Sequence, residues 1–240
     1  MIVGEEEIPI KPLYLILMKN QLGNVKECKT FIRHGCVKVN GEVCTDVQCM
    51  VSRDDCIECH DKWVDANIYA YYMLNKPKGY ISASFDKHDP CVVDLIDRKD
   101  CHCVGRLDRE TTGFLLLTND ESLSKTLLLP SCHCDKKYLV TTKNPIHQDM
   151  VVKFQQGVVI DKDVLCKPAC LEIIDDYHCY VTLQEGKYHQ VKKMFLSCDN
   201  QVIALKRVMF AGLTLDSQLK EGSYRLLNNE EINILLSRRK

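Results

Sequence analysis

The 240-residue sequence predicts an α+β fold, with a small region of helices and a hairpin ahead of a larger region of strands and helices. Apolar residues recur at helical spacing between residues 13 and 22, and the turn signal Asn40-Gly41 follows soon after. From residue 68 onward, short runs rich in β-branched and aromatic residues alternate with turn signals. An apolar share of 45% is enough to bury a core. We therefore expect one large or two smaller domains.

The net charge and the first residues of the chain limit the classes of protein to which it can belong. A formal net charge of -1 and a pI of about 6.7 argue against a polycation that coats nucleic acid, so any RNA contact must come from local patches. The start of the chain carries Glu5-Glu6-Glu7 and lacks the basic and apolar parts of an export signal, and we expect residues 1–10 to be a loosely held end. We therefore expect a cytoplasmic protein with reduced thiols. No apolar run approaches the roughly 20 residues needed to cross a membrane.

Two helices and a hairpin are predicted at the start of the chain. The first helix covers residues 13–22 and is closed by Gly23-Asn24, and the second covers residues 25–34. The alternating run at residues 35–43 contains Asn-Gly, a strong hairpin signal. Basic side chains on or just after the second helix are Lys26, Lys29, Arg33 and Lys38. They suit contacts with a phosphate backbone, although a solvated helix face has the same pattern.

Asp108 lies in the stretch around which the larger region is organised. Residues 114–117 form an apolar run between Gly113 and a Thr-Asn-Asp turn, which is typical of a strand covered on both faces. Asp108 therefore sits on a short loop before a core strand, where the charges of Arg106 and Arg109 favour the carboxylate form. Such a carboxylate suits a nucleophile or a base, but the spacing also fits a surface turn with ion pairs.

The other predicted elements follow in order. An interdomain linker is expected around residues 61–67, and a strand at 68–74 leads into a basic turn with Pro and Gly at 75–80. Further helices are predicted at 122–129, 146–155 and 229–236, and the last part of residues 185–195 is expected to form the first turn of another. Further strands are predicted at 136–141, 157–160, 180–183, 202–205 and 212–215.

Several segments resemble the motifs of one enzyme family. Gly105-Arg106-Leu107-Asp108, with the Thr-Thr-Gly and Thr-Asn-Asp that follow, resembles the catalytic motif of the pseudouridine synthases that act on ribosomal RNA. Within that family it is most similar to the small-subunit enzyme and its large-subunit relatives. Three more segments resemble family motifs: Leu-Asn-Lys-Pro-Lys-Gly-Tyr at 74–80, Lys-x-Tyr at 136–138 and Glu-Gly-Lys-Tyr-His-Gln-Val-Lys-Lys-Met-Phe at 185–195. Lys-Pro-Ala-x-Leu-Glu, which begins at Lys167, favours the small-subunit enzyme.

The resemblance implies a fold and a division into domains. Residues 1–64 are expected to form an S4-like RNA-binding domain, and residues 65–240 a catalytic domain. The catalytic domain should contain a long mixed, largely antiparallel sheet with flanking helices and an active cleft across its middle. The N-terminal region departs from the family motifs at Pro12-Leu13-Tyr14-Leu15 and at Val25-Lys26. These departures predict altered or weak RNA binding by this domain.

The resemblance also implies roles for individual residues. Asp108 is expected to be catalytic, Tyr138 to stack against the target uracil, and Lys192 to pair with Asp108. The turn at 75–80 should also support the catalytic loop by packing. Besides the four basic residues of the first region, RNA contacts are expected from Arg106, Arg109, Lys76, Lys78, Lys187, His189, Gln190, Lys193, Lys206 and Arg207.

The expected activity is the conversion of a specific uridine to pseudouridine in ribosomal RNA. The resemblance points to the 16S small-subunit RNA, at position 516, with a monomeric enzyme acting on the RNA or on the assembling small subunit and using no cofactor. Asp108 would act at C1′ of the sugar or through a glycal-type intermediate. Two alternatives are a large-subunit 23S synthase of the same family and a catalytically silent RNA-binding factor for ribosome assembly.

The cysteines allow one more hypothesis, a structural zinc site. Cys56-x-x-Cys59-His60 and the Cys-His-Cys triplets at 101–103 and 132–134 place thiols and imidazoles close together. Cys-x-Cys is not the usual zinc spacing, and the family resembled here needs no metal. We therefore expect no metal.

Overall fold

The computed structural model describes residues 11–52, 54–66 and 68–238. The chain divides into two compact units between Tyr69 and Ala70, where the sequence suggested a boundary after residue 64. The loosely held end expected at residues 1–10 lies outside the described residues. No helix within the described ranges is long and apolar enough to cross a membrane.

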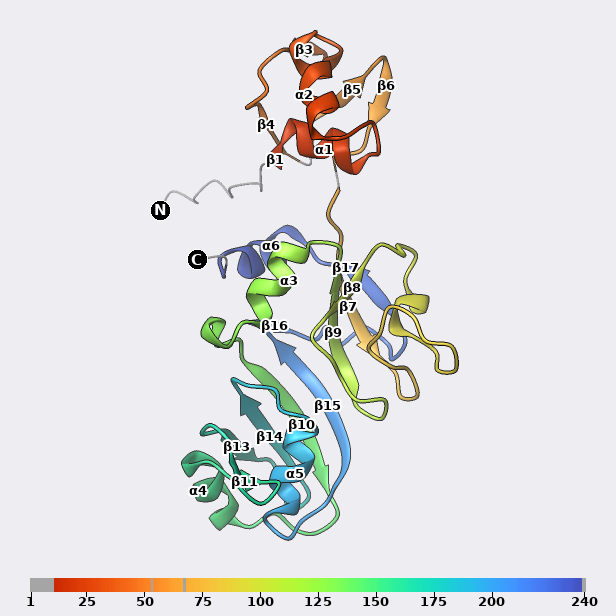
Figure 1. The fold of residues 1–240 in the computed structure, drawn as a ribbon. Helices are drawn as coiled ribbons and strands as arrows, with labels where there is room; N and C mark the ends of the chain where they lie inside the picture. The colour runs from red at the N-terminus through yellow and green to blue at the C-terminus, as the bar shows by residue number, and fades with distance from the viewer. Residues whose placement is uncertain (1–10, 53, 67, 239–240) are drawn as a thin grey trace. The chain divides into compact units, whose positions relative to one another are not determined.

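The first unit (Figure 1) combines two helices with a small sheet. Helix α1 spans Leu13–Lys19 and α2 spans Val25–Arg33. Helix α2 begins after Asn24, whose side chain accepts hydrogen bonds from the backbone N–H groups of Lys26 and Glu27 while the Glu27 side chain accepts from the Asn24 N–H. This capping box satisfies backbone donors at the helix start and fixes where the helix begins.

A four-stranded antiparallel sheet in the order β3-β2-β5-β6 packs with the helices around one core. Its strands are β2 Val37–Val39, β3 Glu42–Cys44, β5 Ile57–Cys59 and β6 Lys62–Val64, while β1 Lys11–Pro12 pairs with β4 Met50–Val51. Asn40 and Gly41 have φ values of 54° and 85°, as the predicted two-residue hairpin turn requires. The expected linker at 61–67 was partly wrong, because Val64 pairs with Ile57 and both side chains are buried in the core.

The second unit is built on a mixed, largely antiparallel sheet in the order β13-β14-β10-β15-β9-β7-β17, with β8 added to β9 and β16 to β15. Only β15 and β9 pair in parallel among the described strands of this sheet. The strands are β7 Tyr71–Lys76, β8 His102–Val104, β9 Thr112–Thr118, β10 Lys136–Thr142, β13 Cys170–Ile173, β14 His178–Leu183, β15 Val202–Phe210, β16 Leu213–Thr214 and β17 Tyr224–Leu226. A separate pair is formed by β11 Val159–Ile160 and β12 Val164–Leu165. The expected α+β fold is confirmed.

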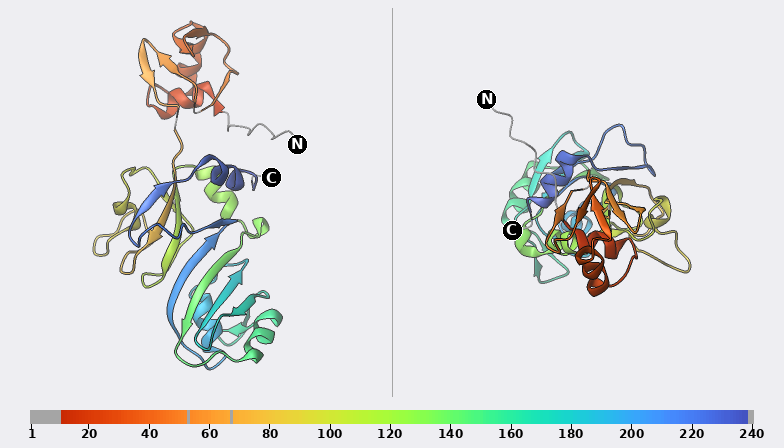
Figure 2. Two further views of the ribbon diagram at one scale, coloured as in Figure 1. Left: turned by 180° about the vertical axis from the view of Figure 1, so that it is seen from behind. Right: turned by 90° about the horizontal axis from the view of Figure 1, so that it is seen from above.

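Helices and 3-10 turns cover the sheet at both of its ends. They are α3 Glu121–Leu128, α4 Gln148–Gln156, α5 Gln190–Leu196, α6 Asn229–Leu236 and the 3-10 turns η1 Val92–Leu95 and η2 Pro130–Cys132. In the two side views of Figures 1 and 2, α4 and α5 lie beside the β13–β14 end, and α3 and α6 lie near β7, β9 and β17. One hydrophobic cluster fills the first end and another fills the second. Tyr138, on the central strand β10, packs against both clusters.

Candidate active site

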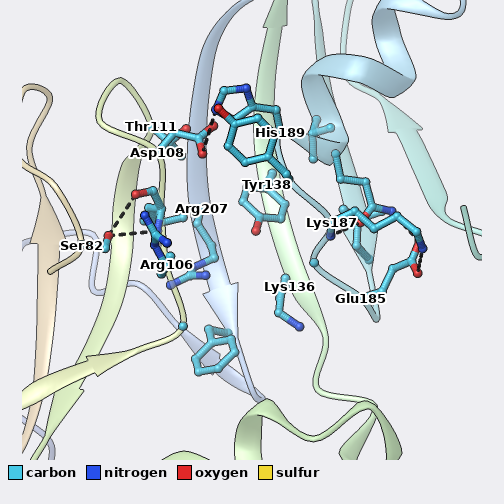
Figure 3. A pocket seen from close by; sticks show the side chains of 18 of the residues that line it. Ser82, Arg106, Asp108, Thr111, Lys136, Tyr138, Glu185, Lys187, His189 and Arg207 are labelled. Atoms are coloured by element: carbon cyan, nitrogen blue, oxygen red, sulfur yellow. Dashed lines mark hydrogen bonds and ion pairs between the residues drawn. The ribbon is translucent and has the colours of Figure 1, made fainter. Parts of the chain in front are cut away.

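A pocket of about 800 Å³ lies over the central strands of the second unit (Figure 3). This volume suits a single nucleotide, since small-molecule sites in proteins range over roughly 300–1,000 Å³. Its walls come from the loop before β9, from β10 and β15, from the segment after α3 and from the start of α5. The polar residues that line it include Ser82, Arg106, Asp108, Arg109, Thr111, Lys136, Tyr138, Lys167, Gln184, Glu185, Lys187, Tyr188, His189, Gln190 and Arg207.

The loop that carries Asp108 is fixed to the body of the unit by hydrogen bonds. The Asp108 carbonyl accepts from the Thr111 N–H at 3.0 Å, which closes a turn immediately before β9. The Ser82 hydroxyl accepts from the Leu107 N–H and donates to the Leu107 carbonyl, both at 3.0 Å. These bonds hold the backbone on both sides of Asp108.

Lys76 provides a third anchor from beneath the loop. Its side chain is fully buried, and Nζ donates to the carbonyls of Pro77, Arg109 and Thr111 at 2.9, 3.1 and 2.9 Å. Burial lowers the pKa of Lys76 to about 8, with nearby acidic side chains, Asp108 among them, acting in the opposite direction. Three donors on one ammonium can satisfy three backbone carbonyls at once. The predicted support of the loop is therefore direct hydrogen bonding rather than packing alone.

The Asp108 carboxylate is bound on each of its oxygens. Lys192 Nζ lies 3.2 Å from Oδ2, and His189 Nε2 lies 3.4 Å from Oδ1. The Asp108 side chain is 29% exposed, so it is held firmly yet reachable from the pocket. Figure 3 shows Asp108, Tyr138 and His189 gathered on the same side of the pocket. The ion pair expected between Asp108 and Lys192 is thus present, and the structure adds His189 to it.

The backbone before α5 places His189 and Lys192 around Asp108. His189 adopts a left-handed conformation, with φ 53° and ψ 30°, directly before the helix. The preceding loop is closed by the Gln190 side chain, which accepts from the Lys187 N–H at 2.9 Å and donates to Glu185 Oε1 at 2.7 Å. Burial raises the pKa of Glu185, but the hydrogen bonds from Lys187, the Lys167 N–H and Gln190 outweigh it and lower the pKa overall.

Tyr138 and Arg207 lie side by side on β10 and β15, where they are register partners. Arg207 is also the parallel partner of Gly113 on β9, so it lies between the loop strand and the tyrosine strand. Its Nε donates to the Phe114 carbonyl at 2.7 Å, and its side chain is 1% exposed. Burial lowers the pKa of Arg207, while the neighbouring Tyr138 acts in the opposite direction.

Three residues expected to contact RNA are buried instead. Lys76 and Arg207 donate hydrogen bonds to backbone carbonyls. Gln190 is 4% exposed and closes the loop before α5. Lys76 and Gln190 find hydrogen bonds inside the protein. Among the described residues, the buried Nη2 of Arg207 has no hydrogen-bond partner. Gln190 and Arg207 line the pocket.

The other basic residues of the second unit remain accessible to different degrees. Arg106 and Lys78 are exposed, and Arg106 lines the pocket. Arg109 pairs with Asp89 at 2.9 Å, Lys187 with Glu185, and Lys193 with Asp161. Lys206 is half-buried on β15 and does not line the pocket.

In the first unit, the basic residues predicted to contact RNA differ in exposure and in whether they already have a partner within the protein. Lys26 and Arg33 are exposed on α2, whereas Lys29 lies over the Tyr14 ring, with Nζ 4.5 Å from the ring centroid. Lys38 pairs with Asp61 at 3.0 Å and with Glu58 at 3.7 Å. A phosphate would have to replace those carboxylates to bind Lys38.

Several pocket residues were missed by the sequence analysis, among them Ser82, Lys136, Lys167 and Tyr188. Lys136 adds a cation to the floor, where burial lowers its pKa and its Nζ donates to the Cys134 carbonyl at 3.1 Å. Its position two residues before Tyr138, on the same face of a strand, was a signal that could have identified it. Ser82 and Lys167 lie in connecting segments with no comparable pattern. Among the described residues, no group of three or more potential metal ligands comes together.

Comparison with known proteins identifies both units. A model of the RNA pseudouridylate synthase family matches residues 70–197, and a model of the S4 domain matches residues 19–57. The ribosomal small subunit pseudouridine synthase A of Haemophilus influenzae is 38% identical over 213 residues, covering 85% of this chain and 90% of the relative. The protein of the same name from Escherichia coli is 39% identical over 212 residues, covering 84% and 89%.

A further relative and a solved structure agree with these matches. An uncharacterized RNA pseudouridine synthase of Bacillus subtilis is 37% identical over 229 residues, covering 92% of this chain and 96% of the relative. A crystal structure of a pseudouridylate synthase superposes with a TM-score of 0.67 at 35% identity, covering 93% of this chain and 98% of that one.

Proposed function

The chain belongs to the RNA pseudouridylate synthase family, and from this premise we propose that it converts a specific uridine of small-subunit ribosomal RNA to pseudouridine. The names of the relatives from Haemophilus influenzae and Escherichia coli support this substrate over large-subunit RNA. The observation that carries the chemistry is the carboxylate of Asp108, held by Lys192 and His189 at a pocket of nucleotide size.

The substrate uridine enters the pocket by leaving its stack. Neither the glycosidic bond nor C5 of uracil can be reached inside a helix, so the nucleotide must be extruded. Arg106, exposed at the pocket, is placed to fill the space that the uridine vacates, and Arg109 can do so if it releases Asp89. Lys187 and the exposed Lys78 add positive charge for the backbone phosphates.

Asp108 carries the central step. The bond between N1 and C1′ breaks, the freed uracil turns within the pocket, and a bond forms between C5 and C1′. The proton lost from C5 and the proton gained by N1 balance, so the reaction is an isomerisation that consumes no cofactor. A carboxylate suits it because it stabilises an oxocarbenium-like sugar or bonds to it, as in glycoside cleavage. Lys192 keeps that carboxylate oriented.

Tyr138 serves as the platform for the uracil ring. It lines the pocket on the central strand β10, packed between the two hydrophobic clusters, so its ring is rigidly placed. A rigid aromatic ring can stack on the base through each stage of the turn without losing contact. Its hydroxyl, or a water that it binds, is suited to take the C5 proton.

The first unit adds affinity rather than chemistry. Lys26, Lys29, Arg33 and, once it releases its carboxylate partners, Lys38 contact phosphates of the ribosomal RNA. We propose that the enzyme acts as a monomer, in the cytoplasm, on free RNA or on the assembling small subunit, and that it binds no metal.

Replacement of Asp108 by Asn tests the proposal, with Asp149→Asn as a control of equal charge change, because Asp149 pairs with Lys153 on the exposed face of α4. Wild type and the control should form pseudouridine in small-subunit RNA, mapped by carbodiimide treatment and primer extension. D108N should bind the RNA with a Kd within about threefold of wild type and form no product. Product from D108N would refute the catalytic assignment, and product from wild type in large-subunit RNA alone would refute the substrate.

A further inference from the structure

Tyr188 is an exposed aromatic residue at the mouth of the pocket. Its side chain is 73% exposed, more than the other large apolar residues that line the pocket, Leu128 at 48% and Leu129 at 54%. An aromatic ring in water forgoes the stabilisation that burial would give it. A ring in this position therefore suits a partner that arrives with the substrate.

The Tyr188 ring is stacked on the ring next to the catalytic carboxylate. Its centroid lies 3.8 Å from that of His189, and the two planes are inclined by only 21°. His189 in turn places Nε2 3.4 Å from Asp108 Oδ1. A base stacked on Tyr188 would thus be separated from the Asp108 carboxylate by two rings, those of Tyr188 and His189.

The backbone holds this ring pair in place before any RNA arrives. The left-handed conformation of His189 and the side-chain bonds of Gln190 to the Lys187 N–H and to Glu185 fix the turn that presents Tyr188. A preformed platform spares the entropy of ordering a side chain on binding. The Tyr188 ring is held in place, so a planar ligand need only displace the Lys193 ammonium that lies over it.

Charge around Tyr188 suits a nucleotide more than an apolar ligand. Lys193 Nζ lies 5.2 Å from the centroid of the Tyr188 ring, and Lys187 and Lys167 line the pocket beside it. A nucleotide offers both a π face for the ring and a phosphate for the cations. An aliphatic chain offers neither a π face to the ring nor a negative charge to the lysines.

We propose that Tyr188 stacks on a nucleobase adjacent to the target uridine and restores the stacking that this neighbour loses when the uridine is extruded. The inference rests on the proposed function, because it assumes an RNA strand whose target uridine occupies the pocket. Extrusion costs a few kcal/mol in lost stacking and pairing. A base stacked on an aromatic side chain recovers about 1–3 kcal/mol of that.

Three substitutions separate stacking from other roles of the ring. Tyr188→Phe keeps the ring and removes the hydroxyl, Tyr188→Leu keeps apolar bulk and removes the π face, and Tyr188→Ala removes both. Tyr177→Ala is the matched control, because Tyr177 is 44% exposed in the same unit but does not line the pocket. The high exposure of Tyr188 means that the variants should fold, which thermal unfolding checks.

Binding is measured with an RNA oligonucleotide from the small subunit that carries 2-aminopurine on one side of the target uridine, and a second that carries it on the other side. For one of the two positions, wild type and Y188F should change the probe fluorescence on binding and give Kd values within about twofold of each other. Y188A and Y188L should abolish that change and raise Kd by about 5- to 150-fold. Y177A should match wild type in Kd and in kcat at saturating RNA.

The proposal is overturned if Y188A binds within twofold of wild type, or if Y188L behaves as Y188F does. A loss of thermal stability in Y188A with unchanged Kd would assign the ring a structural role instead. Failure of the proposed function would look different, since wild type would then form no pseudouridine in small-subunit RNA whatever the state of residue 188.

Discussion

Lys76→Met removes a buried charge from beneath the loop that carries Asp108, and the effect on stability should depend on pH. In wild type the Lys76 ammonium is fully buried and donates to three backbone carbonyls, those of Pro77, Arg109 and Thr111. Methionine has similar length and no charge, so it fills the space but leaves these carbonyls without that donor. An unsatisfied buried group costs about 1–3 kcal/mol. Removal of the ammonium also removes the cost of desolvating it, so the two effects oppose each other near neutral pH.

The size of the pH effect follows from the pKa of Lys76. Burial lowers it from 10.5 to about 8, which corresponds to roughly 3 kcal/mol at 1.36 kcal/mol per pH unit. Between these two values the unfolded chain carries a proton on Lys76 and the folded protein does not. Stability therefore rises with pH across this window, because the unfolded state binds more protons. The Met variant lacks this group, so the stability of wild type relative to the variant should increase by up to roughly 3 kcal/mol from pH 7 to pH 10.

The measurement is urea unfolding of both proteins, under reducing conditions, at pH 7, 8, 9 and 10. Cysteines whose pKa values are raised by burial, such as Cys179 to about 12, destabilise both proteins alike at high pH and cancel in the difference. Lys78→Met, at an exposed lysine close by in the chain, is the control for loss of one lysine charge. K76M should also lower kcat while the Kd for RNA stays within about twofold, since its ammonium does not reach the surface. A gap between wild type and K76M that stays constant from pH 7 to pH 10 would refute the reasoning.

Three further outcomes are expected. Gly113→Ala should destabilise the protein by more than roughly 3 kcal/mol in urea unfolding, because φ is +99° and the new Cβ would lie 2.2 Å from the Arg207 carbonyl oxygen. At Gly186 a new Cβ meets nothing within 4 Å, so Gly186→Ala should be nearly neutral. Equal stability of the two variants would contradict this prediction. Lys192→Met should lower kcat by about 10²-fold in single-turnover assays with little change in RNA affinity, since it removes the 3.2 Å partner of Asp108, and an unaffected kcat would count against the ion pair. Protein purified without chelator or affinity metal should hold less than about 0.1 zinc per chain, and stoichiometric zinc would overturn the expectation of no metal.

The elements that could be predicted are those with strong local signals. The final helix begins and ends where the sequence suggested, at Asn229 and Leu236, and the Asn228 and Glu231 side chains fix its start. The strand β9 was predicted from its uniformly apolar run, and all seven of its residues are buried. Family membership could also be predicted, because the motifs lie in order along the chain, and the family match and the relatives confirm it.

The side-chain environments of the basic residues were harder to predict. Lys76 was assigned to a basic turn, but β7 extends through Lys76 and all six of its residues are buried. A strand buried on both faces has no alternation of apolar and polar residues from which its end could be predicted. Arg207 did carry a signal. It lies two residues from the buried Leu205 on β15 and so points to the same face. Charge alone does not reveal whether an arginine binds a phosphate or a carbonyl.

His189 shows a different limit of sequence analysis. Its proximity to Asp108 depends on a left-handed backbone at position 189 and on side-chain bonds within the loop before α5. The two residues are far apart in the chain, so no spacing rule relates them. Only the tertiary fold, in which α5 and the loop before β9 meet at one pocket, brings them together.

The charge distribution explains why stacking should matter for this enzyme. The net charge is only -1, and several of the basic residues suited to RNA are already paired with carboxylates, including Arg109 with Asp89, Lys193 with Asp161 and Lys38 with Asp61. A phosphate that binds one of these side chains must first displace its carboxylate, so the electrostatic gain is smaller than that from a free cation. Contacts that do not depend on net charge must then supply a larger share of the affinity. Aromatic faces at the pocket, Tyr138 for the target base and Tyr188 for its neighbour, are suited to supply it because stacking is weakly affected by salt.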